Sequence, residues 1–283
     1  VETVFVQHEF GIYGGESGSH LLVLLRRLRM PVIVTLHTVL EKPNAIQKKV
    51  LDEIISIASA VIVMSEMGAD ILDRVHGAGP KKVHVIPHGA PERPFASTEL
   101  FKAPLGLAGH KVIMTFGLLS PNKGIETIIR GLPSVLARHP DAVYLIAGAT
   151  HPHLVANQGE AYRESLIELA RSLGVVEHLR FVNRFLGDEE LVDLLQAADL
   201  YVTPYLTEAQ ITSGTLAYAI ALGKPVVSTP YWHAKEALAD GVGVLCAFND
   251  TRAFAREITS LLSDPAKREA MARRAYKAGE PSR

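Results

Sequence analysis

The sequence predicts an α/β protein built from parallel sheets, arranged in two domains. Three observations support this prediction: short apolar runs, segments of helical period between them, and one break rich in proline and glycine. Apolar runs without polar alternation are typical of strands buried on both faces of a parallel sheet. Regular alternation of strands with helices indicates βαβ units along the whole chain.

Nine short runs rich in β-branched and other apolar residues predict the strands in chain order. These runs are 4–6, 32–36, 61–64, 83–86, 112–116, 143–147, 179–182, 200–202 and 225–228. The segments between them carry apolar residues at helical spacing. The predicted helices are 19–28, 45–58, 67–74, 124–137, 161–173, 188–197 and 213–222, with further helices in 251–277 and a frayed tail at 279–282.

The break between Pro87 and His110 predicts the linker between the two domains. It holds four prolines and three glycines, and proline fixes φ and lacks an N–H donor, so neither a helix nor a central strand is expected. We therefore expect an N-terminal domain at 1–95, a second domain at 108–262, and a C-terminal helix with its tail at 263–283. The first domain has four predicted strands and the second at least five.

Composition excludes several classes of protein. The 29 basic and 30 acidic residues give a formal net charge of -1, so nothing draws the chain to nucleic acid or to an anionic membrane. A single cysteine, Cys246, excludes an internal disulfide framework and a multi-cysteine zinc site, and it fits the reducing cytoplasm. No apolar run approaches the ~20 residues that span a bilayer, and no N-terminal stretch of this sequence combines the basic residues, apolar core and small-residue cleavage site of a secretory signal.

The loop 116–124 is the first candidate site, because ligands of open α/β sheets bind where strands lead into helices. Gly117 permits tight backbone geometry, and Lys123 lies near a helix start that already favours an anion. The alternative is an ordinary loop with a solvated lysine. The absence of GxxxxGK[ST] and GxGxxG excludes a P-loop and a dinucleotide fingerprint.

The loop 204–218 is the second candidate site. Its helix start offers the hydroxyl groups and free N–H groups of Thr212, Ser213, Gly214 and Thr215, a suitable cradle for a diphosphate. The alternative is a plain helix cap by Thr212 or Ser213.

Histidine at the carboxyl end of a first-domain strand gives the third candidate site. His37 ends one strand, and His8 and Glu9 end another, so each is placed to act on a ligand. The alternative is a surface histidine or one with satisfied hydrogen bonds. No metal-ligand spacing surrounds His37 or His20, so no metal site is expected.

Eight segments resemble motifs of the retaining glycosyltransferases of the GT-B fold, of the family 4 or group 1 type. They follow the family's order over most of the chain. The segments are 34–37 ("T-x-H"), 61–65 ("V-x-x-S"), 85–89 ("I-P-N-G"), 117–124 ("G-x-x-x-x-x-K-G"), 145–148 ("L-x-I-x-G"), 185–191, 197–204 ("A-D-x-x-x-x-P") and 219–229 ("A-M-A-x-G-x-P-V-V-x-T").

The resemblance implies two Rossmann-like domains facing a cleft, the first binding a carbohydrate-type acceptor and the second a nucleotide sugar. The reaction implied is metal-independent sugar transfer, with retention of configuration, from a UDP- or GDP-sugar to a glycan, lipid or small glycoside. No cofactor is implied. By position, Lys123 would bind the diphosphate, Phe185 and Leu186 would contact the base, and His37 would lie beside donor and acceptor.

The sequence departs from the family pattern at several positions. Leu118 stands where the family usually has arginine, and the two family glutamates fall on Gln210 and Tyr218. Glu208 is two positions out of register but is still expected to reach the donor sugar through a rearranged loop. Gln210 is expected to hydrogen-bond sugar hydroxyls, and Tyr218 a ribose hydroxyl in place of the carboxylate. The first half of the first domain is expected to be absent, which leaves a sheet edge open to an oligomer partner.

Two other functions stay open at this point. One is a nucleotide-sugar-binding assembly partner whose transferase site has decayed, favoured by the three departures. The other is a different GT-B enzyme, such as a sugar epimerase or a phosphorylase. Some members of the family contact membranes peripherally, but this sequence carries no signal for it.

Overall fold

The computed structural model describes residues 1–283 and contains two parallel sheets, which confirms the predicted fold class. Its contacts divide the chain into two compact units. The first comprises Val1–His88 with Ala209–Ser213, and the second comprises Gly89–Glu208 with Gly214–Arg283. The division falls at the start of the predicted linker. None of the helices combines the length and the apolar character needed to cross a lipid bilayer.

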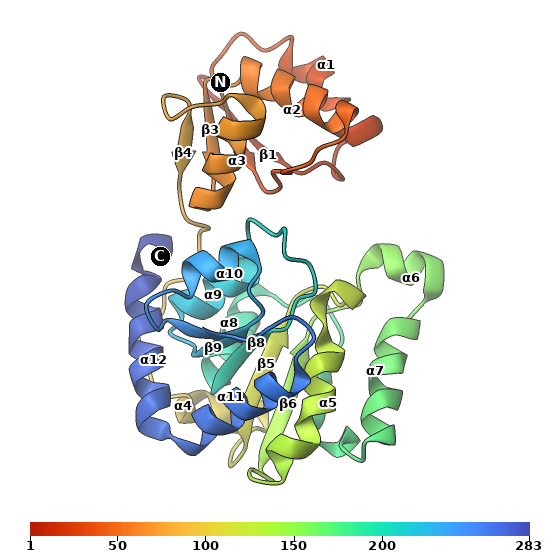
Figure 1. Ribbon diagram of the computed structural model, residues 1–283, viewed down its shortest axis with the longest axis vertical. Helices are drawn as coiled ribbons and strands as arrows, with labels where there is room; N and C mark the ends of the chain where they lie inside the picture. Colours follow the sequence, from red (N-terminus) through yellow and green to blue (C-terminus); the bar gives the residue numbers. More distant parts are fainter. The chain divides into compact units, whose positions relative to one another are not determined.

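The first unit is a four-stranded sheet in the order β1-β2-β3-β4 (Figure 1). Its strands are β1 (Val4–His8), β2 (Val32–Leu36), β3 (Ala60–Val63) and β4 (Val83–Val85). The crossovers are α1 (Leu21–Leu25), α2 (Ala45–Ile57) and α3 (Glu66–His76). Because all three crossovers run in one direction along the sheet, right-handed connections place these helices on one face.

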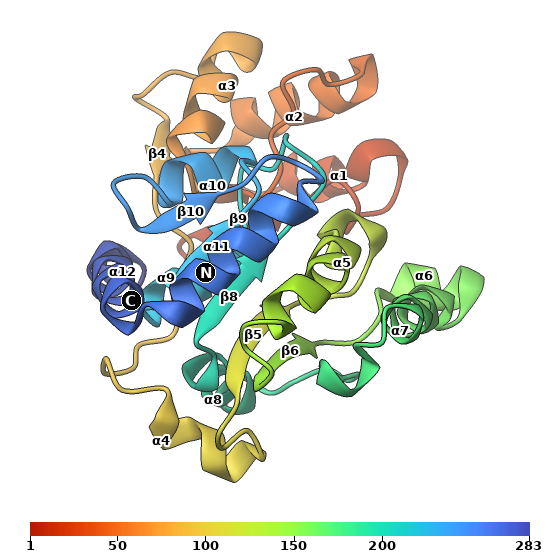
Figure 2. The ribbon, with the colours of Figure 1, turned by 60° about the horizontal axis from the view of Figure 1, so that its bottom comes forward.

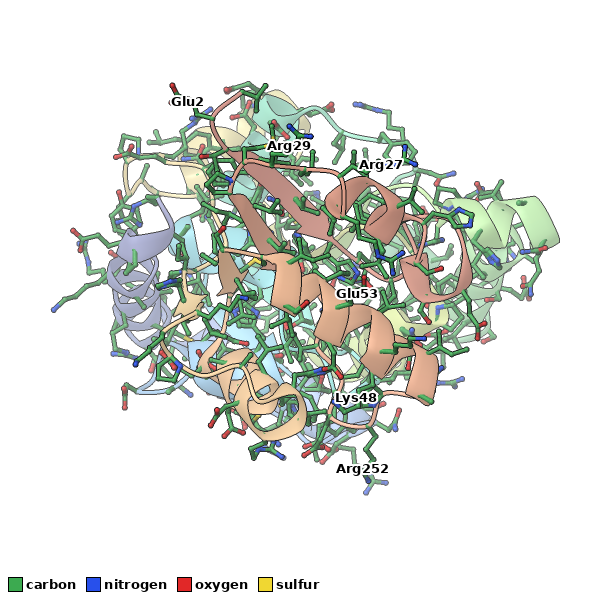
Figure 3. The ribbon with its side chains drawn as sticks, turned by 90° about the horizontal axis from the view of Figure 1, so that it is seen from above. Glu2, Arg27, Arg29, Lys48, Glu53 and Arg252 are labelled. Atoms are coloured by element: carbon green, nitrogen blue, oxygen red, sulfur yellow. The ribbon has the colours of Figure 1, made fainter.

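Local sequence explains where these helices begin and end. Asn44 and Gln47 form a reciprocal capping box at the start of α2, and Ser65 caps α3. Gly77 ends α3 in the left-handed conformation at φ 63°. On the surface, Glu53 of α2 forms an ion pair of 2.6 Å with Arg26, which follows α1; Figure 3 labels Glu53 and Lys48 on α2.

The second unit is a six-stranded sheet in the order β10-β9-β8-β5-β6-β7. Its strands are β5 (Lys111–Phe116), β6 (Ala142–Ala147), β7 (Leu179–Val182), β8 (Leu200–Thr203), β9 (Val226–Ser228) and β10 (Gly243–Leu245). After β5, the strands β6 and β7 are added on one side of it, whereas β8, β9 and β10 are added on the other side. The direction of strand addition therefore reverses between β5 and β8. Helices therefore cover both faces, and each face has its own apolar core.

The helices of the second unit pack in two layers. One layer holds α5 (Ile125–Leu136), α7 (Ala161–Ser172) and α11 (Thr251–Ser263), and α5 and α11 lie side by side in both ribbon views (Figures 1 and 2). The other layer holds α8 (Asp188–Ala197), α9 (Gly214–Ala221), α10 (Trp232–Ala237) and α12 (Pro265–Ala278). The short helices α4 (Glu99–Lys102) and α6 (Pro152–Gln158) complete the unit.

The structure confirms all nine predicted strands and differs from the prediction in short elements and at the C-terminus. The three-residue β10 and the six-residue α10 are too short to show a period in the sequence. The expected frayed tail at 279–282 is wrong, because Glu280–Ser282 forms a 3₁₀ turn and the Arg283 guanidinium donates to Ala221 O at 2.9 Å and Tyr276 O at 2.8 Å. The predicted separate C-terminal element packs with the second unit, where Ala275 is buried.

Candidate functional site

The loops that leave β5 and β8 lie where the strand order of the six-stranded sheet reverses. At such a point the two loops turn to opposite faces of the sheet, and the crevice between them is where open α/β sheets bind ligands. Both predicted anion-binding loops of the second domain leave the sheet here. The topology therefore places the starts of both loops side by side, and their anion binding stays a prediction.

Backbone packing at the ends of β5 and β6 requires glycine. Gly117 and Gly148 adopt φ 125° and φ 131°, and a Cβ on Gly148 would lie 2.2 Å from the Gly117 carbonyl oxygen. The Gly117 N–H donates to Ala147 O at 3.0 Å and the Leu119 N–H to Ala149 O at 2.9 Å. These bonds extend the pairing of the two strands into the site.

The loops after β5 and β8 are also locked together. The Leu206 N–H donates to Asn122 O at 3.0 Å. Gly124 has φ 60°, and a Cβ there would lie 2.1 Å from the Pro204 carbonyl oxygen. The start of α5, which carries Lys123 just before it, is therefore fixed against the β8 loop by backbone contacts.

A small cavity of about 170 Å³ opens at the carboxyl ends of β5, β6 and β7. It brings together three predicted residues, Gly117, Phe185 and Leu186, and Phe185 is 71% exposed at its edge. Its volume is below the ~300–1,000 Å³ of pockets that enclose a whole drug-sized ligand, so it fits one part of a larger molecule. The full lining is Phe116, Gly117, Leu118, Ala147, Gly148, Ala149, Arg184, Phe185, Leu186 and Leu191.

Seven lining residues were not predicted as site residues, among them Gly148 and Arg184. Gly148 ends the "L-x-I-x-G" segment, so its position in that motif is a signal that could have found it. Arg184 carries no such signal; its guanidinium forms a two-pronged ion pair with the exposed Glu190 carboxylate.

Lys123 lies close to two other groups of the predicted site. Its Nζ stands 4.1 Å from the centroid of the Tyr205 ring, and no carboxylate forms an ion pair with it. The Tyr205 hydroxyl is 2.8 Å from Thr215 Oγ1. Thr215 in turn lies beside Gly117, because a Cβ added to Gly117 would be 3.4 Å from Thr215 Cγ2. Lys123, Thr215 and Gly117 therefore form one local cluster, and Tyr205 is a member that the sequence did not indicate.

Other predicted residues of the segment 204–218 do not line the cavity. The half-exposed Glu208 carboxylate forms an ion pair with Lys235 at 2.6 Å, and the backbone carbonyl of Glu208 accepts a hydrogen bond from the Trp232 N–H. The Tyr218 ring packs against Phe116 with centroids 6.1 Å apart. Gly214 is the first residue of α9.

Gln210, Thr212 and Ser213 belong by their contacts to the first unit. A Cβ on Gly68 would lie 3.4 Å from Ile211 Cδ1, which shows how closely this segment packs on α3. The Gln210 side chain donates to Thr212 O at 2.9 Å, so it bonds within its own loop.

The predicted histidine of the first unit sits in a polar cluster at the carboxyl ends of β1 and β2. His37 Nε2 is 2.7 Å from Gln7 Oε1, and Thr38 Oγ1 donates to Glu9 Oε2 at 2.6 Å. Burial, followed by the nearby His88, lowers the pKa of His37 although Glu9 opposes the shift. The lowered pKa favours the neutral imidazole over the protonated form.

His8 lies next to this cluster but is fully buried. Neither of its ring nitrogens has a hydrogen-bond partner, and the ring stacks on Tyr13 and meets the edge of Phe10. Burial lowers the pKa of His8 even though Glu9 raises it. His8 is thus a neutral, unsatisfied group inside the first unit.

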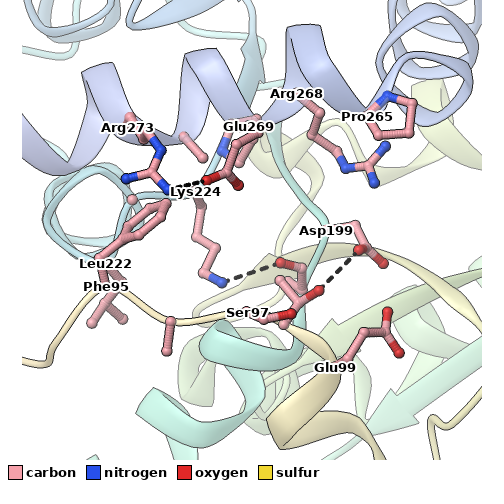
Figure 4. Close-up of a pocket in the computed structure, with 16 residues that line it drawn as sticks. Phe95, Ser97, Glu99, Asp199, Leu222, Lys224, Pro265, Arg268, Glu269 and Arg273 are labelled. Carbon is pink, nitrogen blue, oxygen red and sulfur yellow. Dashed lines mark hydrogen bonds and ion pairs between the residues drawn. The ribbon is translucent and has the colours of Figure 1, made fainter.

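A second cavity, of about 510 Å³, lies at the amino ends of β8 and β9 (Figure 4). Its charged groups serve the fold: Lys224 Nζ donates to Gln196 O at 2.8 Å and to Ala198 O at 3.3 Å, capping α8. The Asp199 carboxylate pairs with buried Lys102 at 2.9 Å and accepts the Val112 N–H at 2.7 Å. No predicted site residue lines this cavity.

Comparison with known families matches both parts of the chain. The model described as "Glycosyl transferases group 1" matches residues 97–278, more than half of the chain, and "Glycosyltransferase Family 4" matches residues 13–92. The protein called D-inositol 3-phosphate glycosyltransferase in Corynebacterium diphtheriae is 31% identical, over 88% of this chain and 61% of its own length. Its namesake in Actinosynnema mirum is 29% identical, over 90% and 64%. The chain thus spans about three-fifths of these relatives.

Solved structures show the same fold. Sucrose-phosphate synthase from Thermosynechococcus elongatus has a TM-score of 0.77 and 21% identity, covering 99% of this chain and 69% of that chain. HepE from Anabaena, solved with UDP and glucose, has a TM-score of 0.74 and 20% identity, covering 98% and 73%. At these identities the likeness extends to the fold alone.

Proposed function

This chain belongs to the group 1 glycosyltransferase family, and we propose that it transfers a sugar from a nucleoside-diphosphate donor to a hydroxyl-bearing acceptor. The observation that carries the proposal is the cluster of Gly117, Lys123 and Thr215 beside the cavity of Phe185 and Leu186. In this proposal the cavity takes the base, and the cluster takes the diphosphate.

Sugar transfer breaks the bond between the anomeric carbon and the diphosphate, so negative charge develops on the leaving group. A fixed ammonium at that point stabilises the charge as it forms. Lys123 suits this role because no carboxylate pairs with it. The family resemblance supports retention of anomeric configuration and independence of a metal ion as further parts of the proposal.

The donor base is proposed to be uracil, because HepE of similar fold was solved with UDP-glucose. The base would stack on Phe185, whose ring is exposed at the cavity edge. GDP is the alternative, to be separated by the binding test below.

The acceptor is proposed to bind the first unit near His37. A neutral imidazole can accept a hydrogen bond from a sugar or polyol hydroxyl, and the lowered pKa of His37 favours that form. Relatives named for D-inositol 3-phosphate support a small polyol or glycoside, with a glycan or lipid as the other classes. A cytoplasmic location is also proposed, because the lone Cys246 cannot form an internal disulfide.

The test is nucleotide binding followed by turnover. Calorimetric titration of the 283-residue chain should show binding of UDP in preference to GDP, and Lys123→Ala should weaken UDP binding by about 10-fold or more through loss of a charge-assisted contact. Release of UDP from UDP-glucose should depend on Lys123 as well. Binding of neither nucleotide at millimolar concentration contradicts the proposal.

Two observations favour a second function, that of a nucleotide-sugar-binding partner without turnover. The Glu208 carboxylate is engaged by Lys235, and Tyr218 packs on Phe116 where the family has a glutamate. UDP binding at wild-type strength with no release of UDP from any donor sugar would select this second function.

A further inference from the structure

We propose that Tyr205 is a positioning residue that holds the Lys123 ammonium in place for the donor diphosphate without neutralising it. The proposal rests on the function proposed above and assigns a role to a residue that no motif indicated. It concerns only the second unit, in which both side chains lie.

The first step is the nature of the contact on Lys123. Its Nζ stands 4.1 Å from the centroid of the Tyr205 ring, within the range of a cation–π interaction. A carboxylate in this place would also hold the lysine, but it would cancel the charge and compete with the diphosphate. The ring face attracts the ammonium and leaves its positive charge uncancelled, ready for an anion.

The second step is that Tyr205 is itself fixed. The ring is 1% exposed and stacks on Tyr231 with centroids 5.2 Å apart and planes 20° apart. The Tyr205 carbonyl accepts from Thr229 Oγ1 at 2.6 Å, which fixes the backbone as well.

The third step is that Tyr205 joins the two loops of the proposed diphosphate site. Its face carries Lys123 from the β5 loop, and its hydroxyl is 2.8 Å from Thr215 Oγ1 in the first turn of α9. The N–H of the adjacent Leu206 donates a hydrogen bond to Asn122 O at 3.0 Å. One rigid side chain therefore sets the spacing between an ammonium and a hydroxyl that are far apart in the sequence.

The test compares UDP with uridine, since uridine lacks the diphosphate that Lys123 is proposed to bind. By calorimetric titration, Tyr205→Leu should weaken UDP binding by about 3- to 30-fold, the range expected for a cation–π contact, and leave uridine binding unchanged. Tyr205→Phe retains the ring and should stay within about 3-fold of wild type for UDP. Equal losses for UDP and uridine with Tyr205→Leu would assign Tyr205 a merely structural role.

A double-mutant cycle gives the coupling directly. In a Lys123→Met background, Tyr205→Leu should change UDP binding by less than about 2-fold, because the group that it positions is gone. The same loss in both backgrounds overturns the proposal.

A fluorination series covers the case in which Tyr205→Leu does not fold. Phenylalanine, monofluoro-, difluoro- and trifluorophenylalanine placed at position 205 keep the ring shape while weakening its negative face. UDP binding should fall stepwise along the series and uridine binding should stay constant; a flat response for UDP refutes the role of the ring. If wild type binds UDP and fluorination does not change UDP binding, only the proposed role of Tyr205 is refuted. If wild type binds no nucleotide, both this proposal and the proposed function are refuted.

Discussion

Lys224 illustrates how a single buried residue sets a pH dependence. Its ammonium is enclosed near the amino ends of β8 and β9, where it caps α8. Burial lowers its pKa to about 7, against the opposing effect of Asp199. The unfolded chain keeps the ordinary value near 10.5, so between pH 7 and 10.5 the unfolded state binds more protons than the folded state.

The prediction for Lys224→Met concerns the slope of stability with pH. Wild type should gain stability relative to the variant as the pH rises above 7, by up to about 1.4 kcal/mol per pH unit. Urea unfolding between pH 7 and 9 measures the difference, with the exposed Lys81→Met as control. Parallel pH profiles for wild type and Lys224→Met would contradict the lowered pKa.

The buried His8 of the first unit should make stability depend on pH in the acidic range, below pH 7. Its pKa is lowered by burial, so the unfolded state takes up a proton first as the pH falls through about 6.5. Stability should therefore decrease from pH 6.5 downward until the lowered folded pKa is passed. His8→Leu should flatten this decrease in thermal unfolding between pH 7 and 5. The exposed His84→Leu should keep the wild-type profile, and an unchanged profile in His8→Leu would count against the interpretation.

At the scale of elements, the site depends on how closely the ends of β5 and β6 approach. The predicted strands and the loop glycine Gly117 follow from apolar runs and turn preferences, which are local properties. The need for glycine at 148 comes from a neighbouring strand instead, because its missing Cβ makes room for the Gly117 carbonyl oxygen.

Gly148→Ala should therefore reduce the free energy of unfolding by about 3 kcal/mol or more, from an unfavourable φ of 131° together with a backbone clash. It should also weaken UDP binding, because Gly117 has to move. Gly106→Ala is the matched control: it adopts the left-handed conformation at φ 68° and ψ 25°, and nothing lies near its Cβ, so a cost of about 1 kcal/mol is expected. Equal costs at the two positions, measured by urea unfolding, would show that the clash is relieved elsewhere.

At the scale of the whole molecule, β1 is one of the two edge strands of the first sheet, and β4 is the other. The only strand partner of β1 is β2, and Phe5 is 67% exposed. Unpaired edges with exposed apolar side chains invite pairing with another chain.

We predict that the 283-residue chain self-associates through the β1 edge. Phe5→Lys should shift sedimentation toward the monomer and change stability by less than about 0.5 kcal/mol, since the side chain is exposed. Leu100→Lys, on α4 of the second unit and 70% exposed, is the control that should leave association unchanged. Identical concentration dependence for wild type and Phe5→Lys would remove β1 as the interface.

The sequence by itself determined the alternation of strands and helices, the parallel sheets and the family, and it predicted Gly117 and Lys123 as anion-binding positions. These features depend on residues that are neighbours along the chain, so their pattern is readable without coordinates. Only the tertiary structure placed Tyr205 under Lys123, engaged Glu208 with Lys235, and grouped Gln210 with the first unit. Each of these contacts joins segments distant in sequence, because the reversal of strand order between β5 and β8 decides which loops meet.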